Sequence, residues 1–248
     1  GDLIVEAGGD VSLQGGHSRE NYAMIGHGGF DNKREGTDVD NAGIGAARIR
    51  VDADGEVSLT GGSGSVSYAQ IGHVGATHDL TSFVENAISV SAGGDLTLQG
   101  GMGTVSSANT SYAMIGHGGS NSDFTALPGG YTGDIEVAVG GDLAMLAGNR
   151  NVNFVQIGHG GYQSEGDHEG NIKVTVGGAT GITMQSGDAS SYSTDYAQIG
   201  HGGVSAGGDH SGEIGVVATA GGISLDALNN ASATGGQGYA MIGHGGQN

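Results

Sequence analysis

The 248-residue chain contains no cysteine, no tryptophan, few other aromatic residues and few basic residues. The absence of cysteine excludes disulfide bridges, thiolate metal sites and thiol catalysis. Aromatic residues make up only 5% of the chain, whereas compact sandwiches and propellers usually fill their interiors with large side chains. We therefore expect a thin core of small and β-branched side chains that is repeated along an axis.

The shortage of basic residues limits the possible partners. Only 7 Lys and Arg residues oppose 26 acidic residues, which gives a net charge of −19. Nucleic-acid binding needs clustered basic side chains, so we expect no nucleic-acid partner. Anionic membranes would repel this chain, and no apolar run approaches the ~18 residues of a membrane helix, so no membrane insertion is expected. Gly1–Ile4 carry no basic region followed by an apolar stretch, so any export signal is expected to lie outside this sequence.

Glycine is abundant instead, with 55 residues, about three times its usual share. A string of the form YAxIGHGG, in which Phe or Val replaces a residue in some copies, recurs along the whole chain. Successive histidines of the string are 46, 44, 42, 42 and 43 residues apart: His27, His73, His117, His159, His201 and His244. The chain is therefore one domain of six repeats, at about residues 1–29, 30–75, 76–119, 120–161, 162–203 and 204–246.

Three short strands are expected in each repeat. Before the string lie two segments in which apolar and polar residues alternate, separated by a glycine corner that is Gly-Gly-Asp in three repeats. Period-two alternation is typical of half-buried strands. In the third segment Ala23 and Ile25 share one face, and Tyr22 and Met24 share the other. Because the fifth repeat has Gln198 in place of Met24, and an unpaired buried amide is costly, we expect Tyr and Met/Gln to form the outer face.

Strands joined at glycine corners and stacked repeat upon repeat predict an all-β fold, a right-handed parallel β-helix with one rung for each repeat. Rungs would rise by about 4.8 Å. The alternative is a six-bladed β-propeller, but a blade needs four strands, and residues 81–84 and 124–127, which could supply a fourth, lack counterparts in the shorter repeats. Neither end shows an amphipathic capping segment, so we expect a segment of a longer solenoid or a unit that stacks end to end.

The order of strand, Gly-Gly-Asp corner, strand and YAxIGHGG string resembles the repeats of large bacterial exoproteins of the filamentous-haemagglutinin type. Gly93–Gly101, with the sequence GGDLTLQGG, shows the corner and second strand clearly. The resemblance covers the whole chain. It implies a secreted, long parallel β-helix, exported by a two-partner or autotransporter-like route, that acts as a surface adhesin, a biofilm or extracellular-matrix component or a filament. It implies no catalytic residue.

The six repeat histidines are the sharpest chemical feature. If the alternation of Ala23, Ile25 and His27 continues, each imidazole points inward at a corner and stacks over its neighbours. The structural interpretation is a column of neutral rings that hydrogen-bond backbone groups. The functional alternative is a metal ladder, since imidazole is the commonest transition-metal ligand. No Cys, Asp or Glu recurs within the string to complete a tetrahedral set, so we expect no metal.

An aromatic column is expected beside the histidines. Its role would be stacking from rung to rung, and the alternative is a platform for sugar rings or for a second fibre. The column consists of Tyr22, Tyr68, Tyr112, Phe154, Tyr196 and Tyr239.

Acidic loops are the third candidate site. Calcium takes six to eight oxygen ligands, which such loops could supply, but the known calcium-loop patterns are absent. We therefore expect no cofactor, and calcium stays open as an alternative. The dipeptides Asp167-His168 and Asp209-His210 recur in consecutive loops as weaker signals. The acidic residues are Asp31, Glu35, Asp38 and Asp40 in the first loop and Glu165, Asp167 and Glu169 in the fourth.

Catalysis is not expected, because an active site is normally one asymmetric cluster and these candidates are repeated by symmetry. The sequence predicts a structural or adhesive segment of a secreted or cell-surface bacterial protein, whose partner is itself, by axial stacking of solenoid ends. The alternative is a β-helix that binds or cleaves carbohydrate, with surface glycans as partners. An ice- or mineral-binding face is disfavoured because no Thr-x-Thr ladder recurs.

Overall fold

The computed structural model describes residues 1–30, 47–76, 78–80, 84–102, 110–124, 129–149, 152–187, 194–228 and 238–247, without the side chains of 78–80 and 123–124. Every regular element in these ranges is a β-strand. No helix in the described ranges is long and apolar enough to cross a membrane.

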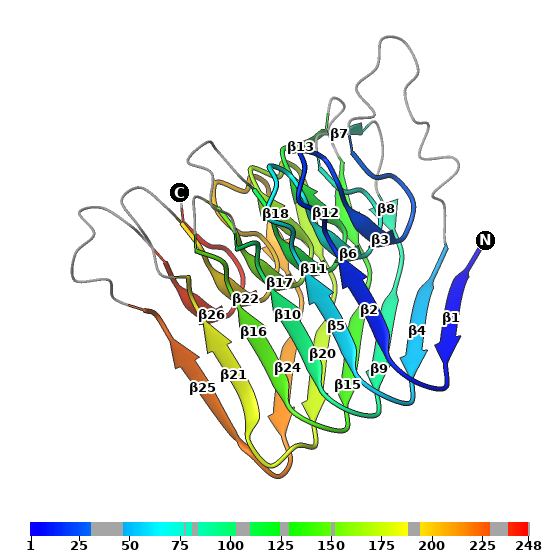
Figure 1. The fold of residues 1–248 in the computed structure, drawn as a ribbon. Coiled ribbons are helices and arrows are strands. Elements are labelled where there is room, and N and C mark those ends of the chain that lie inside the picture. The colour runs from blue at the N-terminus through cyan, green and yellow to red at the C-terminus, as the bar shows by residue number, and fades with distance from the viewer. Residues whose placement is uncertain are drawn as a thin grey trace.

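Three parallel sheets of six strands run the length of the molecule, and we call them sheets A, B and C (Figure 1). Each repeat contributes one strand to each sheet and so forms one three-sided rung. Sheet A contains β1 (Leu3–Ala7), β4 (Ile49–Ala53), β9 (Ile88–Ala92), β15 (Ile135–Val139), β20 (Ile172–Val176) and β24 (Ile214–Ala218). Sheet B contains β2 (Val11–Gln14), β5 (Val57–Thr60), β10 (Leu96–Gln99), β16 (Leu143–Leu146), β21 (Gly181–Gln185) and β25 (Gly222–Asp226). Sheet C contains β3 (Ala23–Ile25), β6 (Ala69–Ile71), β11 (Ala113–Ile115), β17 (Val155–Ile157), β22 (Ala197–Ile199) and β26 (Ala240–Ile242).

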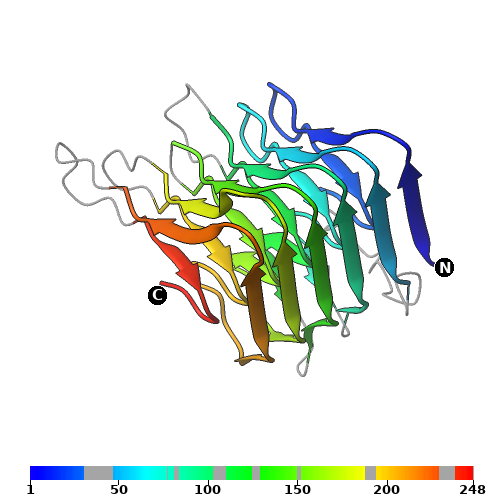
Figure 2. The same ribbon diagram turned by 90° about the horizontal axis from the view of Figure 1, so that it is seen from below.

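Equivalent residues lie directly above one another in successive rungs. Val51 of β4 pairs with Val5 on one side and Val90 on the other, and Ile71 of sheet C pairs with Ile25 and Ile115. The predicted parallel β-solenoid is confirmed. The six-bladed propeller is wrong, because the strands pair between repeats rather than within a four-stranded blade (Figure 2).

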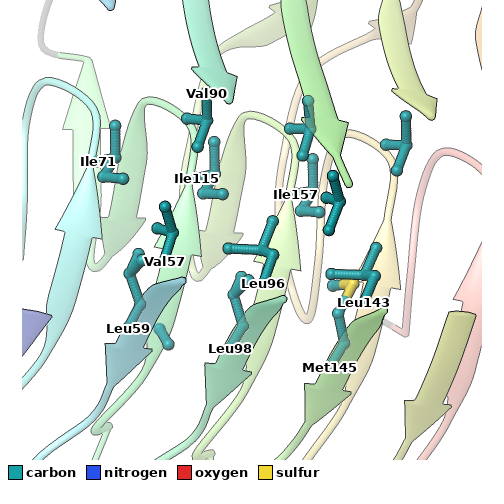
Figure 3. Close-up of a cluster of buried hydrophobic side chains, with 14 of the residues drawn as sticks. Val57, Leu59, Ile71, Val90, Leu96, Leu98, Ile115, Leu143, Met145 and Ile157 are labelled. Atoms are coloured by element: carbon teal, nitrogen blue, oxygen red, sulfur yellow. The ribbon is translucent and has the colours of Figure 1, made fainter. Parts of the chain in front are cut away.

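Aliphatic side chains fill the space that the three sheets enclose. In β4, Ile49 and Val51 point inward and are buried, whereas Arg50 and Asp52 point outward. Figure 3 shows Val, Leu, Ile and Met side chains of neighbouring rungs meeting in this interior. Full burial of such a side chain contributes about 1.5–3 kcal/mol, so the alternation of apolar and polar residues is what fixes the inward face of each strand.

Aspartates hold the corner between sheets A and B. The Asp10 carboxylate accepts a hydrogen bond from the backbone N–H of Glu56 on the next rung at 2.8 Å, and Asp95 accepts one from Asp142 at 2.8 Å. Asp142 in turn accepts from Thr180 and Gly181 at 3.0 and 2.9 Å. The bond from Gly181, followed by those from Thr180, holds the pKa of Asp142 below its usual range. The Gly-Gly-Asp corner therefore links rungs as well as turning the chain.

A short fourth parallel sheet lies in the segments that follow the histidines, and the sequence did not reveal it. Its strands are β8 (Val84–Glu85), β14 (Gly130–Thr132), β19 (Asp167–Glu169) and β23 (His210–Ser211). Two further pairs lie in the same segments, β12 (Gly118–Ser120) with β18 (Gly160–Tyr162) and β7 (His78–Leu80) with β13 (Ser122–Phe124). Of the residues 81–84 and 124–127 that we weighed as a fourth strand, only Val84 and Phe124 are described; Val84 pairs with Tyr131 and Phe124 with Leu80. The short strands of these segments pair with equivalent strands of neighbouring rungs, in sheets separate from A, B and C, and do not form the fourth strand of a propeller blade.

Candidate functional site

The six repeat histidines form one column along the solenoid. Neighbouring ring centroids are 4.7–5.1 Å apart, and neighbouring ring planes lie within 11° of parallel. The four interior rings are fully buried: His73, His117, His159 and His201. Because each histidine comes two residues after its sheet C strand, the column lies where the chain leaves sheet C.

From the second rung to the sixth, one nitrogen of the histidine ring closes its own rung. Nε2 of His117 lies 2.8 Å from the carbonyl oxygen of Asn86, which stands two residues before the sheet A strand of the same rung. Nε2 of His159 lies 2.8 Å from the Gly133 carbonyl in the same way. His73, His201 and His244 repeat this contact at 2.8–3.1 Å. The imidazole therefore ties the end of a rung to its beginning.

The other ring nitrogen links neighbouring rungs. Nδ1 of His117 accepts a hydrogen bond from the backbone N–H of His73 at 3.0 Å, and the His117 N–H donates to Nδ1 of His159 at 3.1 Å. A backbone N–H can only donate, so Nδ1 must carry the lone pair and Nε2 the proton. Each interior ring is thus held as one neutral tautomer with both nitrogens engaged.

Burial keeps these rings neutral. Burial, with the neighbouring His73 ring as the second cause, lowers the pKa of His117 to about 3. Burial likewise lowers the pKa of His73 and of His201 to about 4, and it lowers the pKa of His159 well below its usual value. Burial disfavours the charged form of an imidazole, and like charges on adjacent rungs add to that effect.

The geometry leaves the interior column no lone pair for a metal ion. The Nδ1 lone pair of His73, His117, His159 and His201 is taken by a backbone N–H, and Nε2 carries the proton. Transition metals bind the unprotonated imidazole nitrogen. No group of three or more His, Asp or Glu side chains able to hold a metal occurs in the described ranges. The metal-ladder alternative therefore has no support in this column.

Close packing explains the glycines around each histidine. A Cβ on Gly116 would overlap the carbonyl oxygen of Gly158 on the next rung. Gly118 adopts a φ of 100°, in the left-handed region that glycine tolerates. A Cβ on Gly119 would meet the hydroxyl of Tyr112. The IGHGG string is therefore explained position by position.

The aromatic column stacks on the other face of sheet C. Ring centroids of successive rungs are 4.7–4.9 Å apart with planes within 9° of parallel. The expectation that this face is exposed is wrong, because its four interior rings are fully buried: Tyr68, Tyr112, Phe154 and Tyr196. They form a second buried cluster with residues of the flanking segments, such as Val66, Ala76 and Val204.

The buried glutamine side chains are fully hydrogen-bonded. The expectation that glutamine would avoid burial was wrong for this reason, because only an unpaired amide is costly to bury. Nε2 of Gln156 donates to the carbonyls of Gly200 and Gly202 on the next rung, both at 3.1 Å. Its Oε1 accepts from the Tyr196 hydroxyl at 3.1 Å. A buried amide costs little once its groups are satisfied. Gln70 and Gln198 make the equivalent bonds to their next rungs.

The single phenylalanine of the column follows the same logic. The rungs that follow a glutamine carry tyrosine, because Tyr112, Tyr196 and Tyr239 each donate to a glutamine Oε1. Phe154 lies on the rung after Met114 and stacks on Tyr112. The Met114 thioether is only a weak hydrogen-bond acceptor. The aromatic residue thus matches the acceptor offered by the preceding rung at four of the five junctions, and the exception is Tyr68, which is buried on the rung after Met24.

The two Asp-His dipeptides meet in the fourth sheet. His168 pairs with His210, and their Nδ1 atoms lie 3.0 Å apart. Nε2 of His168 lies 3.2 Å from Oγ of Ser164, and all of Ser164 and His168 is buried. Burial lowers the pKa of both histidines, and the unfavourable interaction with a proton on a neighbouring histidine ring lowers it further. A Ser-His-His chain exists here, but its serine is inaccessible to a substrate.

The acidic loops show no calcium site in their described part. Asp167 accepts a hydrogen bond from the backbone N–H of Asp209 at 2.9 Å, and Glu165 and Glu169 form no metal-holding group with other described residues. The four acidic residues of the first loop lie outside the described residues: Asp31, Glu35, Asp38 and Asp40.

The sequence missed two parts of this site. The Gln-Tyr pairing had a signal in the repeats, because Gln70, Gln156 and Gln198 are each followed by a tyrosine in the next string, whereas Met114 is followed by Phe154. The fourth sheet had a signal in the Gly-x-Ile ending of its segments, as at Gly133-Asp134-Ile135 and Gly170-Asn171-Ile172. Comparison of the chain with known family models, with curated proteins and with solved structures finds no match.

Proposed function

We propose that this chain is a structural and adhesive segment of a secreted bacterial surface protein, not an enzyme. The supporting observation is that both nitrogens of every interior histidine are engaged in holding rungs together. Catalysis and metal binding need a free nitrogen, whereas a stiff rod needs every rung to be tied to the next. The recurrent IGHGG string is then a device for stacking.

An extracellular location is part of this proposal. It is supported by the resemblance to secreted exoprotein repeats and by the net charge of −19, which keeps a long β-structure soluble and opposes sideways association. Surface display on intact cells would be tested with an antibody to the folded solenoid. Antibody labelling that is seen only after the cells are permeabilised would contradict an extracellular location.

Axial assembly is the second part of the proposal. The two termini lie at opposite ends of the stack (Figures 1 and 2), and the first and sixth rungs carry the same columns of residues. Negative-stain electron microscopy of the purified chain would test it. Rods whose length grows in multiples of the single unit support assembly. Particles of one unit length at all concentrations contradict it.

Carbohydrate binding is the alternative, and the outward face of sheet B is its candidate surface. The aromatic column is buried and cannot serve as a sugar platform. The outward positions of sheet B instead bear no charge from β2 to β21, and Asp226 of β25 is the one exception. They are mostly hydroxyl and amide side chains: Ser12, Gln14, Ser58, Thr60, Thr97, Gln99, Thr183 and Gln185.

A matched pair of variants would test this alternative. Thr97→Glu places a charge in the middle of the outward face of sheet B, and Ser89→Glu places one on the outward face of sheet A. If the chain binds a neutral glycan through sheet B, Thr97→Glu abolishes binding on a glycan array and Ser89→Glu does not. Equal loss in both variants, or no binding by the parent chain, contradicts this alternative.

A further inference from the structure

A hollow crosses the outward face of sheet A over the second to fourth rungs, at strands β4, β9 and β15 (Figure 1). Two adjoining depressions of about 240 and 250 Å³ form it, and both are lined by Arg48 and Ala87. The third rung supplies the floor, where Ala87 and Ser89 are small and half-buried. The hollow therefore exists because one rung with short side chains lies between two rungs with long ones.

The walls of the hollow carry opposite charges. One wall is basic and consists of Arg48 and Arg50 of the second rung. The other wall is acidic and consists of Asp134 and Glu136 of the fourth rung. In the register of sheet A, Arg50, Ser89 and Glu136 occupy equivalent positions of successive strands. Two strand spacings separate the walls by about 10 Å, so the two walls do not form ion pairs with each other across the floor.

The ion pairs that the wall residues do form lead away from the floor. Arg50 contacts Glu6 of the first rung at 3.5 Å and also contacts Asp52 of its own strand. Glu136 pairs with Lys173 of the fifth rung at 2.7 Å. Arg50 and Glu136 are solvent-exposed, and ion pairs of exposed side chains contribute little to stability. A charged ligand can therefore replace these pairs at small cost.

The spacing of charges along each wall equals the spacing of side chains along an extended peptide. Each wall consists of two residues separated by one inward-pointing residue, Ile49 or Ile135. In an extended chain such positions are about 7 Å apart. A peptide lying in the hollow parallel to β9 repeats at the same distance and directs alternate side chains to opposite sides. It can therefore direct acidic side chains to one wall and basic side chains to the other in a single register.

We propose that this hollow binds an extended segment of a partner protein in which acidic and basic residues alternate. The acidic side chains of the segment face Arg48 and Arg50, and its basic side chains face Asp134 and Glu136. A purely basic segment is attracted by the net charge of −19 but repelled by the arginine wall, and a purely acidic segment is repelled by most of the surface. The proposal goes beyond the function proposed above, because it needs neither axial assembly nor the surface of sheet B.

Two peptides of the same composition and charge test the proposal in NMR titrations of the isotopically labelled chain at low ionic strength. Both have blocked ends. The first is Glu-Lys-Glu-Lys-Glu-Lys-Glu-Lys, and it is expected to shift the amide signals of Ala87, Ser89 and their neighbours with a dissociation constant on the order of 1 mM. The second is Glu-Glu-Lys-Lys-Glu-Glu-Lys-Lys, which brings one like charge to each wall when extended. It is expected to bind about tenfold more weakly.

Three variants locate the binding. Ser89→Arg fills the hollow at a position whose neighbours on both sides already carry long side chains, and it is expected to abolish the shifts. Thr175→Arg adds the same charge to the outward face of sheet A on the fifth rung, outside the hollow, and should leave the affinity unchanged within about twofold. Arg48→Glu should weaken the alternating peptide by about tenfold and bring the two peptides to similar affinities. Circular dichroism checks that each variant keeps the fold.

The titrations can overturn the proposal in three ways. Equal affinity of the parent chain for the two peptides would show that the hollow does not recognise alternation. Shifts that persist in Ser89→Arg would place the binding elsewhere on the surface. No shift at peptide concentrations about tenfold above the expected dissociation constant would remove the site itself. None of these results bears on axial assembly, which the rod lengths in electron microscopy decide separately.

Discussion

Two interiors lie side by side in this molecule, one on each face of sheet C. The interior enclosed by the three sheets is aliphatic. The layer on the other face holds stacked aromatic rings and paired glutamines. The column of neutral imidazoles lies where the chain leaves sheet C. The aliphatic interior accepts different side chains at equivalent positions of successive rungs, as Leu59, Leu98 and Met145 show. At the equivalent positions of the IGHGG string, by contrast, all six rungs carry histidine.

The difference reflects two kinds of interaction. Apolar burial has no direction, so side chains of similar volume substitute for one another at small cost. A buried hydrogen bond requires a donor opposite an acceptor, and a mismatch leaves a polar group unsatisfied. The aliphatic interior therefore supplies most of the stability, and the polar columns select which residue lies on which. Changes that act on one interior and spare the other can test this division.

Acid gives the largest expected effect because it acts on the polar columns. An unfolded histidine titrates near pH ~6.5, whereas the pKa is about 4 for His73 and His201 and about 3 for His117. Between these values the unfolded chain binds protons that the folded column excludes, so stability is complete above about pH 6.5 and falls as the pH drops toward 4. Each of these three rings contributes about 3 kcal/mol to the loss between pH 6.5 and 4. Denaturant titrations at a series of pH values would measure it.

A single substitution isolates one ring of the column. In His117→Asn the amide oxygen replaces Nδ1 as acceptor for the His73 N–H, but the side chain does not titrate. We expect lower stability at neutral pH, because the bond to the Asn86 carbonyl is lost, and a pH dependence that is flatter by about 3 kcal/mol. His17→Asn, at an exposed position, should keep the parent's slope. A slope equal to the parent's in His117→Asn would show that buried rings do not set the acid limit.

The sequence was enough to predict the solenoid, because period-two alternation and a fixed repeat are local signals. Strands such as Ile49–Ala53 and Ala69–Ile71 lie where the pattern places them. The sequence was not enough to show that Tyr112 and Gln156 are buried, because their cover comes from segments of varying length outside the strands. A polar side chain such as Gln156 is expected to be exposed from its sequence alone, and its hydrogen-bond partners on the next rung become evident only in the folded structure.

Gly116→Ala is expected to have the next largest effect, because it strikes the contact between successive rungs. The new Cβ would overlap the Gly158 carbonyl oxygen, which is backbone and cannot move without opening the junction. We expect a loss of about 4 kcal/mol or more, measured by thermal or denaturant unfolding. Gly215→Ala is the matched control, because nothing lies within 4 Å of a Cβ there. Equal melting temperatures for the two variants would contradict the tight rung contact.

Leu98→Ala probes the aliphatic interior. Leu98 is fully buried between Leu59 and Met145 of the neighbouring rungs, so truncation should cost about 2–5 kcal/mol through lost burial and a cavity. Leu98→Met should cost less than about 1.5 kcal/mol, because the volume is kept. Both variants should retain the acid dependence of the parent. A changed pH slope in either would mean that the two interiors are not independent.

Phe154→Tyr carries the smallest expected effect and the most specific test of the polar columns. The added hydroxyl would lie over Met114, which offers only a weak acceptor, so its proton would be buried without a good partner at a cost of about 1–3 kcal/mol. Met114→Gln should restore the pairing seen between Tyr196 and Gln156, so the double variant should be more stable than the sum of the two single changes allows. A double-mutant cycle from urea unfolding measures this coupling. Additive losses would show that ring stacking and burial alone, without the hydroxyl-to-amide bond, decide which aromatic residue each rung carries.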